Sequence, residues 1–385
     1  MQIVVAPDSF KDALGSEQAG RRIMAGVHKA VPEARVQRLV MSDGGEGFAR
    51  AYAQNEPDAM TTREPTVDAL GRPTLAEWIE IGHSAHAPST AVIMDLAGAS
   101  GIERLKPHER DPFKTSTLGS GMLLSKAVAS CAATRYILGL GGSATVDAGI
   151  GIAMHLGVKL TDRDGQPIKP YAGGQALTRI SRIKLPERSV FEDVGARLVL
   201  ACDVDNPLTG AAGAAHVYGP QKGATPPQVE QLDAGLRHIA GLWRDQLGVD
   251  VEHLPGAGAA GGVAGGLVAM LGAELVPGAE LILETIGFDE RISGADLVIT
   301  GEGRLDHQSL NGKAVIAVAR RCQAAGVPCH ALVGSAGEGA DHALRHGLSA
   351  YHVIGAGLPA EESIRRSGEL LEQAAVKLAQ DRLLN

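Results

Sequence analysis

A short apolar run that leads directly into a dense polar segment is the feature that most limits what this chain can fold into. Residues 296–300 form the apolar run, and residues 301–306 follow with two glycines, two acids and an arginine. Ligands in α/β folds bind outside the carboxyl ends of strands, so we expect Glu302, Arg304 and Asp306 to line a ligand site. The alternative is a solvated charged turn.

The beginning of the chain repeats this arrangement. Residues 2–6 form a continuous apolar run of the kind that is buried on both faces of a parallel sheet. A helical pattern and a second apolar run follow, which is typical of a βαβ unit. Polar side chains come directly after the two runs: Asp8, Ser9, Lys11 and Asp43. We expect these side chains to meet at one edge of the sheet.

Alternation of strands and helices returns at the end of the chain, whereas the middle has another pattern. Residues 61–81 alternate in polarity around a turn, which is typical of antiparallel strands. A chain of 385 residues is long enough for two domains. We expect a doubly wound, Rossmann/flavodoxin-like α/β domain built from residues 1–60 and 287–385, and a smaller inserted α/β domain with a mixed sheet over residues 61–286.

Composition excludes several classes of partner. The net charge of -8 argues against nucleic acid or an anionic membrane surface, because both require a basic face. Glycine is abundant, with 50 residues in 385 against a usual share of about 7%, and it gathers in short polar segments that suit backbone-built anion sites. The four cysteines lack paired spacing, and neither a signal peptide nor a membrane span is evident. We therefore expect a cytoplasmic protein.

A glycine-rich segment in the middle of the chain, GLGGSATVD at residues 139–147, follows an apolar run. Its spacing fits the GxGxxG/A dinucleotide fingerprint, and a phosphate or nucleotide loop of another kind explains it as well. We favour the phosphate loop, and simple packing glycines are the third interpretation. The residues expected to contact phosphates are Gly141, Gly142, Ser143 and Thr145.

Two further candidates lie near strand and helix ends. Asp203 and Asp205 follow an apolar run, and a carboxylate pair of this spacing suits a divalent cation, although a structural turn before Asn206 explains it too. Lys222 stands close to a predicted helix start and suits a phosphate. The alternative is an ordinary surface lysine.

Several long motifs resemble those of the bacterial glycerate kinases of the glycerate 2-kinase type. The matching motifs are IVVAPDSFKDAL (3–14), SDGGEG (42–47), GLGGSATVDAG (139–149), DVDNPLTGAAGAA (203–215), YGPQKGAT (218–225), PGAGAAGG (255–262) and ITGEGRLDHQSLNGK (299–313). The resemblance covers nearly the whole chain. Departures from the family pattern are Asp12 for Gly, Ala13 for Ser, Val146 for Asn and Ala148 for Gly.

The resemblance implies two α/β domains with ATP, Mg²⁺ and D-glycerate meeting between them. Phosphorylation at the 2-hydroxyl, giving 2-phospho-D-glycerate, is the first expectation, and the 3-hydroxyl is the alternative. An NAD-dependent hydroxy-acid dehydrogenase and a non-catalytic sugar-acid sensor are remoter possibilities. A monomer and a homodimer are both compatible with the sequence.

The resemblance, read together with the residues, also suggests roles for the candidate side chains. Phosphoryl transfer depends on charge neutralisation and alignment. Lys11 and Lys222 would offset charge on the transferred group, and Asp203 or Asp205 would help to hold Mg²⁺. Arg304, with Ser9 and Glu302, would bind glycerate. The expected base is Asp8, with Asp43 and Asp306 as alternatives.

Overall fold

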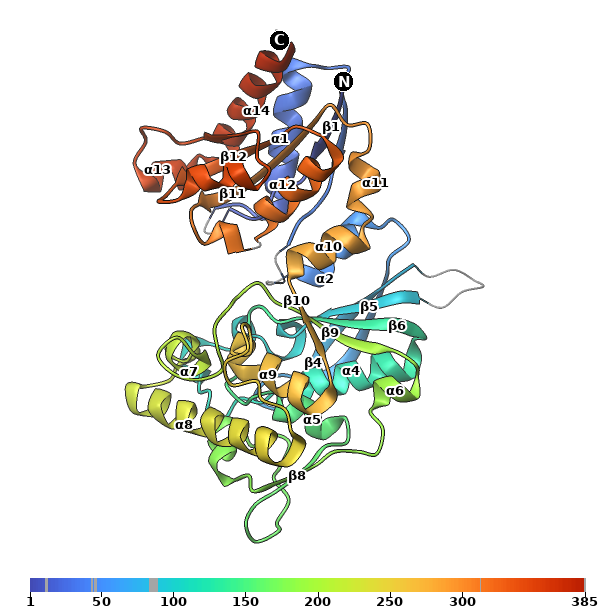
Figure 1. Ribbon diagram of the computed structural model, residues 1–385, viewed down its shortest axis with the longest axis vertical. Coiled ribbons are helices and arrows are strands. Elements are labelled where there is room, and N and C mark those ends of the chain that lie inside the picture. Colours follow the sequence, from blue (N-terminus) through green and yellow to red (C-terminus); the bar gives the residue numbers. More distant parts are fainter. Residues whose placement is uncertain (11–12, 43, 45–46, 83–88, 312, 384–385) are drawn as a thin grey trace. The chain divides into compact units, whose positions relative to one another are not determined.

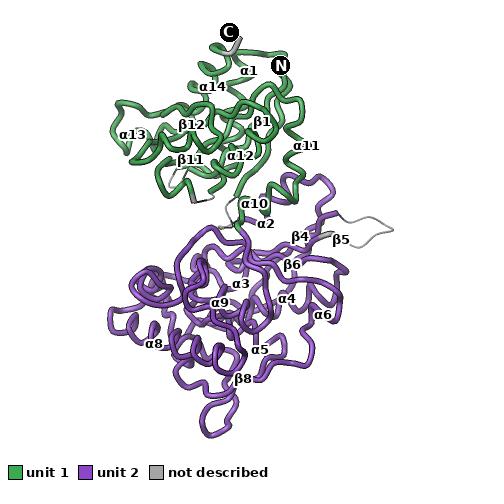
Figure 2. Tube along the Cα trace, in the orientation of Figure 1, with its two compact units in different colours: residues 1–43, 277–385 green, residues 44–276 purple. Residues whose placement is uncertain are grey.

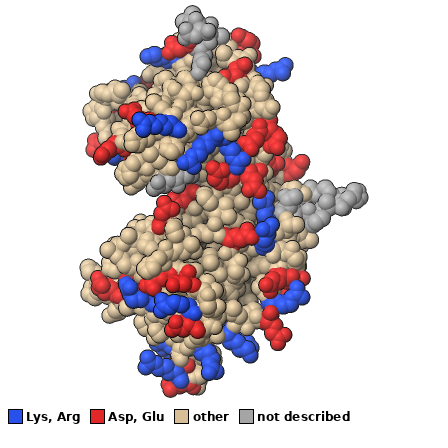
Figure 3. All heavy atoms as spheres, in the orientation of Figure 1, with Lys and Arg blue, Asp and Glu red and all other residues tan. Residues whose placement is uncertain are grey.

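The computed structural model describes residues 1–10, 13–42, 44, 47–82, 89–311 and 313–383. The chain divides into two compact units, residues 1–43 with 277–385 and residues 44–276 (Figure 2). No helix in the described part of the chain is long and apolar enough to span a membrane. Basic and acidic side chains are interspersed over the visible face of each unit (Figure 3).

The division differs in two respects from the expected boundaries after residues 60 and 286. Helix α2 (Phe48–Asn55) packs on strands of the inserted unit, and helix α10 (Gly278–Thr285) packs on helices of the other unit. Each helix belongs to the unit against which its buried face packs. A boundary drawn from the change in sequence pattern does not reveal these contacts. The inserted unit is also the larger of the two, not the smaller.

Unit 1 contains a parallel sheet of five strands in the order β13-β12-β11-β1-β2 (Figure 1). The strands are β1 (Gln2–Val5), β2 (Arg35–Arg38), β11 (Leu297–Leu305), β12 (Cys329–Ala336) and β13 (Ala350–Val353). This is the flavodoxin-like order, in which the direction of winding reverses between β1 and β11. The reversal places a crevice outside the carboxyl ends of these two strands.

Helices cover the sheet of unit 1. They are α1 (Ser16–Ala30), α10, α11 (Phe288–Ile292), α12 (Ala314–Ala325), α13 (Ala360–Arg365) and α14 (Ser367–Leu383). Helices α1 and α14 pack against each other over a core that includes Ile3, Ile23 and Leu371. Helix α12 packs on β11 and β12. Because crossovers are right-handed, winding in opposite directions from the reversal point puts α1 and α12 on opposite faces.

Unit 2 contains a mixed sheet of six strands in the order β10-β9-β6-β5-β4-β3. The strands are β3 (Met60–Val67), β4 (Pro73–Ile81), β5 (Ser89–Asp95), β6 (Ala133–Gly139), β9 (Arg197–Ala201) and β10 (Glu274–Val276). β3 and β4 pair antiparallel with their neighbours, and β5, β6, β9 and β10 run parallel. A separate small pair is formed by β7 (Lys159–Thr161) and β8 (Arg182–Lys184).

The helices of unit 2 bury its largest apolar side chains. They are α2, α3 (Ala97–Ser100), α4 (Leu118–Ser130), α5 (Ile150–His155), α6 (Val190–Asp193), α7 (Ala214–Tyr218), α8 (Pro226–Leu242) and α9 (Ala259–Leu271). Trp78, Tyr136 and Trp243 all lie in its core. Each unit therefore has a hydrophobic core of its own.

One local expectation was wrong. The polar residues after residue 300 were expected to lie beyond the end of a strand, but β11 continues through Leu305 and pairs with β12 up to Leu305↔Ala336. Backbone pairing does not depend on side-chain polarity, and the glycines allow a close approach: a Cβ on Gly301 would lie 2.3 Å from the Leu332 carbonyl oxygen. The polar residues are therefore held on a strand.

Candidate active site

A cleft of about 750 Å³ opens in unit 1. Four of the side chains expected to form a site line it together: Asp8, Ser9, Glu302 and Arg304. They follow β1 or lie in the second half of β11, the two strands at which the winding reverses. The structure thus brings these four predicted residues together in one cleft.

The backbone at the end of β1 holds Asp8 against β11. The Asp8 amide donates to the Gly301 carbonyl oxygen at 2.8 Å, and the Asp8 Oδ1 atom accepts a hydrogen bond from the Ser9 amide at 2.7 Å. Asp8 is buried, with 7% of its surface exposed. The carboxylate therefore has a defined place in the wall of the cleft.

Arg304 is held by a neighbouring acid. Glu302 and Arg304 share one face of β11, because side chains alternate along a strand. The Arg304 Nε atom lies 3.0 Å from the Asp306 Oδ2 atom, and the Arg304 side chain is 68% exposed. Asp306 is buried and accepts the Gln308 amide at 2.9 Å through its other oxygen. Asp306 thus orients Arg304, and it is missing from the described residues that line the cleft.

Two residues that were not predicted also line the cleft, and two predicted residues cannot be placed. Lys313 and Ser335 line the cleft, although neither was among the site residues predicted from the sequence. Ser335 could have been found from the Gly-Ser-Ala-Gly segment at the end of its apolar run, and Lys313 from its place at the end of the motif ITGEGRLDHQSLNGK (299–313). Lys11 and Asp43 lie outside the described residues.

The buried amine of Lys222 holds the glycine-rich segment of unit 2 through hydrogen bonds. The Lys222 Nζ atom donates to the Ser143 Oγ atom at 2.6 Å and to the Thr145 carbonyl oxygen at 2.8 Å. Lys222, Ser143 and Thr145 are all buried, whereas Gly141 and Gly142 are half-buried. The three buried side chains therefore shape the loop, and its two glycines are the more accessible part.

Burial changes the charge balance beneath this loop. It lowers the pKa of Lys222 to about 7, although the nearby Asp147 carboxylate acts in the opposite direction. Burial also raises the pKa of Asp147, which accepts hydrogen bonds from the Thr117 amide and hydroxyl, each at 2.8 Å. These contacts tie the loop to the start of α4.

The glycine and alanine tract at residues 256–266 is part of the same support. Ala260, Gly261 and Gly262 have φ values of 56°, 74° and 85° at the start of α9. A Cβ on Gly261 would lie 2.0 Å from the Thr145 carbonyl oxygen. Only glycine permits both the left-handed conformation and this approach.

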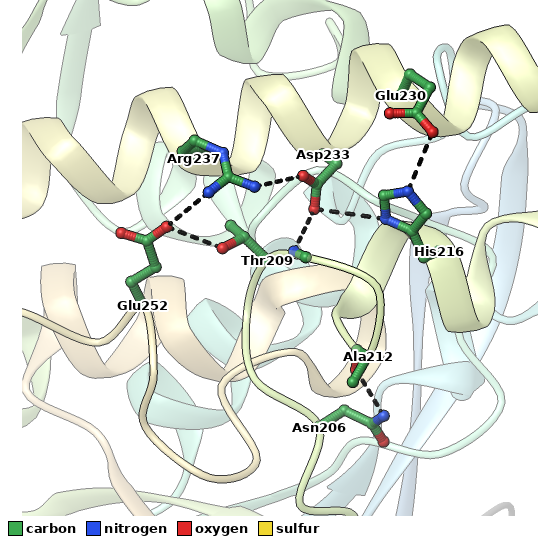
Figure 4. Close-up of polar contacts among 9 residues, drawn as sticks. Asn206, Thr209, Ala212, His216, Glu230, Asp233, Arg237 and Glu252 are labelled. Atoms are coloured by element: carbon green, nitrogen blue, oxygen red, sulfur yellow. Dashed lines mark hydrogen bonds and ion pairs between the residues drawn. The ribbon is translucent and has the colours of Figure 1, made fainter.

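The segment after Asp203 and Asp205 is fixed by polar contacts, some of them with side chains of α8 (Figure 4). Asp233 accepts the Gly210 amide at 2.8 Å and pairs with Arg237 at 2.8 Å. Further contacts join Thr209 to Glu252 at 2.8 Å and Asn206 to the Ala212 carbonyl at 2.8 Å. The two aspartates thus precede a well-anchored turn.

Asp203 is half-buried and Asp205 is exposed. Within the described ranges, no group of three or more His, Cys, Asp or Glu side chains is placed to hold a metal ion. Two carboxylates are nevertheless a sufficient protein contribution for Mg²⁺, which keeps water and phosphate oxygens as its other ligands. The donor set therefore fits a metal that arrives with a nucleotide.

Known proteins resemble this chain over nearly its whole length. The glycerate kinase family matches residues 3–382. The chain belongs to this family. It is 40% identical to the glycerate kinase of Halalkalibacterium halodurans, over 98% of this chain and 97% of that protein. It is 38% identical to the glycerate 2-kinase of Escherichia coli, over 91% and 89% of the two chains.

A solved structure supports the same family. The crystal structure of a putative glycerate kinase 2 from Salmonella typhimurium LT2 matches with a TM-score of 0.82 and 34% identity, over 100% of this chain and 98% of that one. The expected two-domain α/β fold is thereby confirmed. The structure argues against a dinucleotide fingerprint at residues 139–144. Such a fingerprint must open a helix, whereas α5 begins only at Ile150.

One departure from the glycerate kinase pattern has a structural consequence. Ala148 stands where the family pattern has glycine, and its φ is 53°, in the left-handed region. An alanine in this conformation is strained by about 1–2 kcal/mol. Ala148 is fully buried, so the methyl group recovers part of this free energy through packing.

Proposed function

We propose that this protein transfers the γ-phosphoryl group of ATP to the 2-hydroxyl of D-glycerate and forms 2-phospho-D-glycerate. Membership of the glycerate kinase family and the similarity to a relative named glycerate 2-kinase support the reaction and the position. The observation that carries the proposal is the cleft in unit 1, which is lined by the exposed Arg304 together with the buried acids Asp8 and Glu302.

Arg304 is proposed to bind the glycerate carboxylate. Its fork of N–H donors matches a carboxylate in two hydrogen bonds, and the ion pair with Asp306 restricts the side chain before the substrate arrives. Ser9 and Glu302 line the same cleft and suit the hydroxyl groups of a small sugar acid. A short, polar acid therefore finds complementary groups at this site.

Asp8 is proposed as the base. The glycerate hydroxyl oxygen attacks the γ-phosphorus, the bond from this phosphorus to the bridging oxygen of ADP breaks, and the hydroxyl proton passes to the Asp8 carboxylate. Asp8 lines the cleft, whereas Asp306, which pairs with Arg304, is not among the described residues that line it. This difference in surroundings favours Asp8 over Asp306 for the role.

The nucleotide and its metal are assigned to unit 2. The backbone of Gly141 and Gly142 is proposed to contact phosphates, with Ser143, Thr145 and Lys222 as the support of that backbone. Asp203 and Asp205 would hold Mg²⁺, which supplies charge neutralisation on the phosphates when bound. Lys11, expected to offset charge on the transferred group, remains part of the proposal.

A coupled assay tests the reaction and its position. The protein is incubated with Mg-ATP and D-glycerate, ADP release is followed, and the product is offered to enolase with and without phosphoglycerate mutase. Direct formation of phosphoenolpyruvate is the expected result. A requirement for the mutase would place the phosphate on the 3-hydroxyl, and the absence of glycerate-dependent ADP would refute the kinase assignment.

A further inference from the structure

Lys313 lines the cleft of unit 1 beside the residues proposed to bind glycerate. It stands at the N-cap position of α12, with an extended backbone at φ -60° and ψ 160°. The Lys313 carbonyl accepts the Ile316 and Ala317 amides, each at 3.0 Å. Residues 314–319, the first half of α12, are fully buried. The side chain of Lys313 therefore extends from a rigid base.

The turn between β11 and α12 carries Lys313 back to the cleft. The Ser309 hydroxyl accepts the Asp306 amide at 3.2 Å and donates to the Arg304 carbonyl at 3.4 Å. The Ser309 amide donates to the Asp306 carbonyl at 3.0 Å, and Ser309 is fully buried. These hydrogen bonds tie the turn to the end of β11 that holds Arg304. The two cations of the cleft thus come from one continuous, anchored segment.

Lys313 supplies a positive charge that no acid shares. The described residues that line the cleft include two acids and two cations, which are Asp8, Glu302, Arg304 and Lys313. Arg304 pairs with Asp306 at 3.0 Å. Lys313 is half-buried and forms neither an ion pair nor a side-chain hydrogen bond with any residue that the structure describes. The charge of Arg304 is partly compensated before a ligand arrives, and that of Lys313 is not.

The acids of the cleft restrict where a second anionic group can bind. The described lining and Asp306 together contain three acids and two cations, so such a group is stable only close to a cation that has no acid partner. Lys313 provides this position. The N-terminus of α12, which carries a partial positive charge, begins at the next residue. A lysine acts on phosphate as a compact point charge, so the position suits a phosphate.

The proposed reaction creates a second anionic group in this cleft. Glycerate pairs with Arg304 and gives its hydroxyl proton to Asp8, so the phosphoryl group is received in unit 1. The cleft of about 750 Å³ has room for a carboxylate and a phosphate together. Of the two lysines predicted to offset this charge, Lys222 is buried in unit 2 with its amine engaged, and Lys11 lies outside the described residues.

We propose that Lys313 is a catalytic residue that binds the transferred phosphoryl group and then holds the phosphate of the product. The inference rests on the proposed function, because the phosphoryl group reaches this cleft only if the substrate is phosphorylated there. The bond from the γ-phosphorus to the bridging oxygen of ADP breaks as the bond to the glycerate oxygen forms. The Lys313 ammonium offsets the negative charge on the phosphoryl oxygens and keeps its proton throughout.

Calorimetry with the two acids tests the phosphate contact without turnover. The dissociation constants of 2-phospho-D-glycerate and D-glycerate are measured for the wild type, Lys313→Met and Lys313→Arg. Loss of a charge-assisted hydrogen bond predicts about 10- to 100-fold weaker binding of 2-phospho-D-glycerate to Lys313→Met. Binding of D-glycerate should stay unchanged, because its carboxylate pairs with Arg304. Lys313→Arg retains the charge and should recover most of the affinity.

A matched control and a kinetic readout separate this role from a structural one. Lys377→Met is the control, because Lys377 is exposed in the same unit and does not line the cleft. In Lys313→Met we expect kcat to fall by about 10²- to 10³-fold, as for other groups that stabilise charge in a transition state, while KM for D-glycerate stays constant. A lysine that only supports the start of α12 would instead shift the urea midpoint and weaken both ligands.

The outcomes also separate this inference from the reaction itself. An unchanged affinity for 2-phospho-D-glycerate in Lys313→Met overturns the role of Lys313 even if the protein phosphorylates glycerate. Equal weakening of both acids overturns it as well. Selective weakening of the phosphorylated acid, with the control unaffected, supports the phosphate contact even if the coupled assay shows no glycerate-dependent ADP. A wild type that binds neither acid contradicts both proposals.

Discussion

Replacing Lys222 by methionine tests whether burial controls the charge of this lysine. The Nζ atom is buried with Ser143 and Thr145 as hydrogen-bond partners, and burial lowers the pKa of Lys222 to about 7. In an unfolded chain a lysine titrates near pH 10.4. Methionine has a similar length and carries no charge, so the substitution removes the titration and retains most of the packing.

The sign of the effect follows from proton linkage. Between about pH 7 and pH 10, unfolded Lys222 binds a proton that the folded protein releases. The free energy of unfolding therefore rises with pH over this window, by up to about 1.4 kcal/mol per pH unit for this one group. From pH 7.5 to pH 9.5 this amounts to up to roughly 2.5 kcal/mol, and the contribution is absent from the methionine variant.

Urea unfolding followed by tryptophan fluorescence is a suitable assay. Both tryptophans of the chain, Trp78 and Trp243, lie in the core of unit 2, so the signal reports the unit that contains Lys222. Burial raises the pKa of the Cys131 and Cys329 thiols, which lowers stability at alkaline pH equally in both proteins and cancels in the comparison. Parallel pH dependences for wild type and Lys222→Met would refute the reasoning.

Three further predictions concern the loop support and the cleft of unit 1. Gly261→Ala should cost about 3–5 kcal/mol, because left-handed strain adds to a clash at 2.0 Å, whereas Gly272→Ala, with a φ of 64° and open space around the Cβ, should cost about 1 kcal/mol. Equal midpoints in urea would contradict this. Asp8→Asn should lower kcat by about 10²- to 10⁴-fold. Asp306→Asn should mainly raise KM for D-glycerate, by about 3- to 10-fold, through the loss of the ion pair that holds Arg304. Near-normal turnover in Asp8→Asn with none in Asp306→Asn would exchange their roles.

Much of the site in unit 1 could be predicted because its chemistry is local in sequence. Asp8 and Ser9 come directly after an apolar run, and Glu302 and Arg304 directly follow another. Parallel strands bring their carboxyl ends to one edge, so placing the strands also places the polar groups. The length of β11 was missed, because glycines and charged residues usually end a strand and here a neighbouring strand extends it.

Other features were decided by the tertiary structure alone. Lys222 meets Ser143 and Thr145 across almost eighty positions of the sequence, and only packing shows that its amine is buried. The membership of α2 and α10 in their units arises in the same way from contacts between distant elements. The sequence by itself determined the strands, their polar ends and the family. Burial, which sets the charge and the accessibility of each group, depends on neighbours that are remote along the chain and is therefore a property of the folded protein.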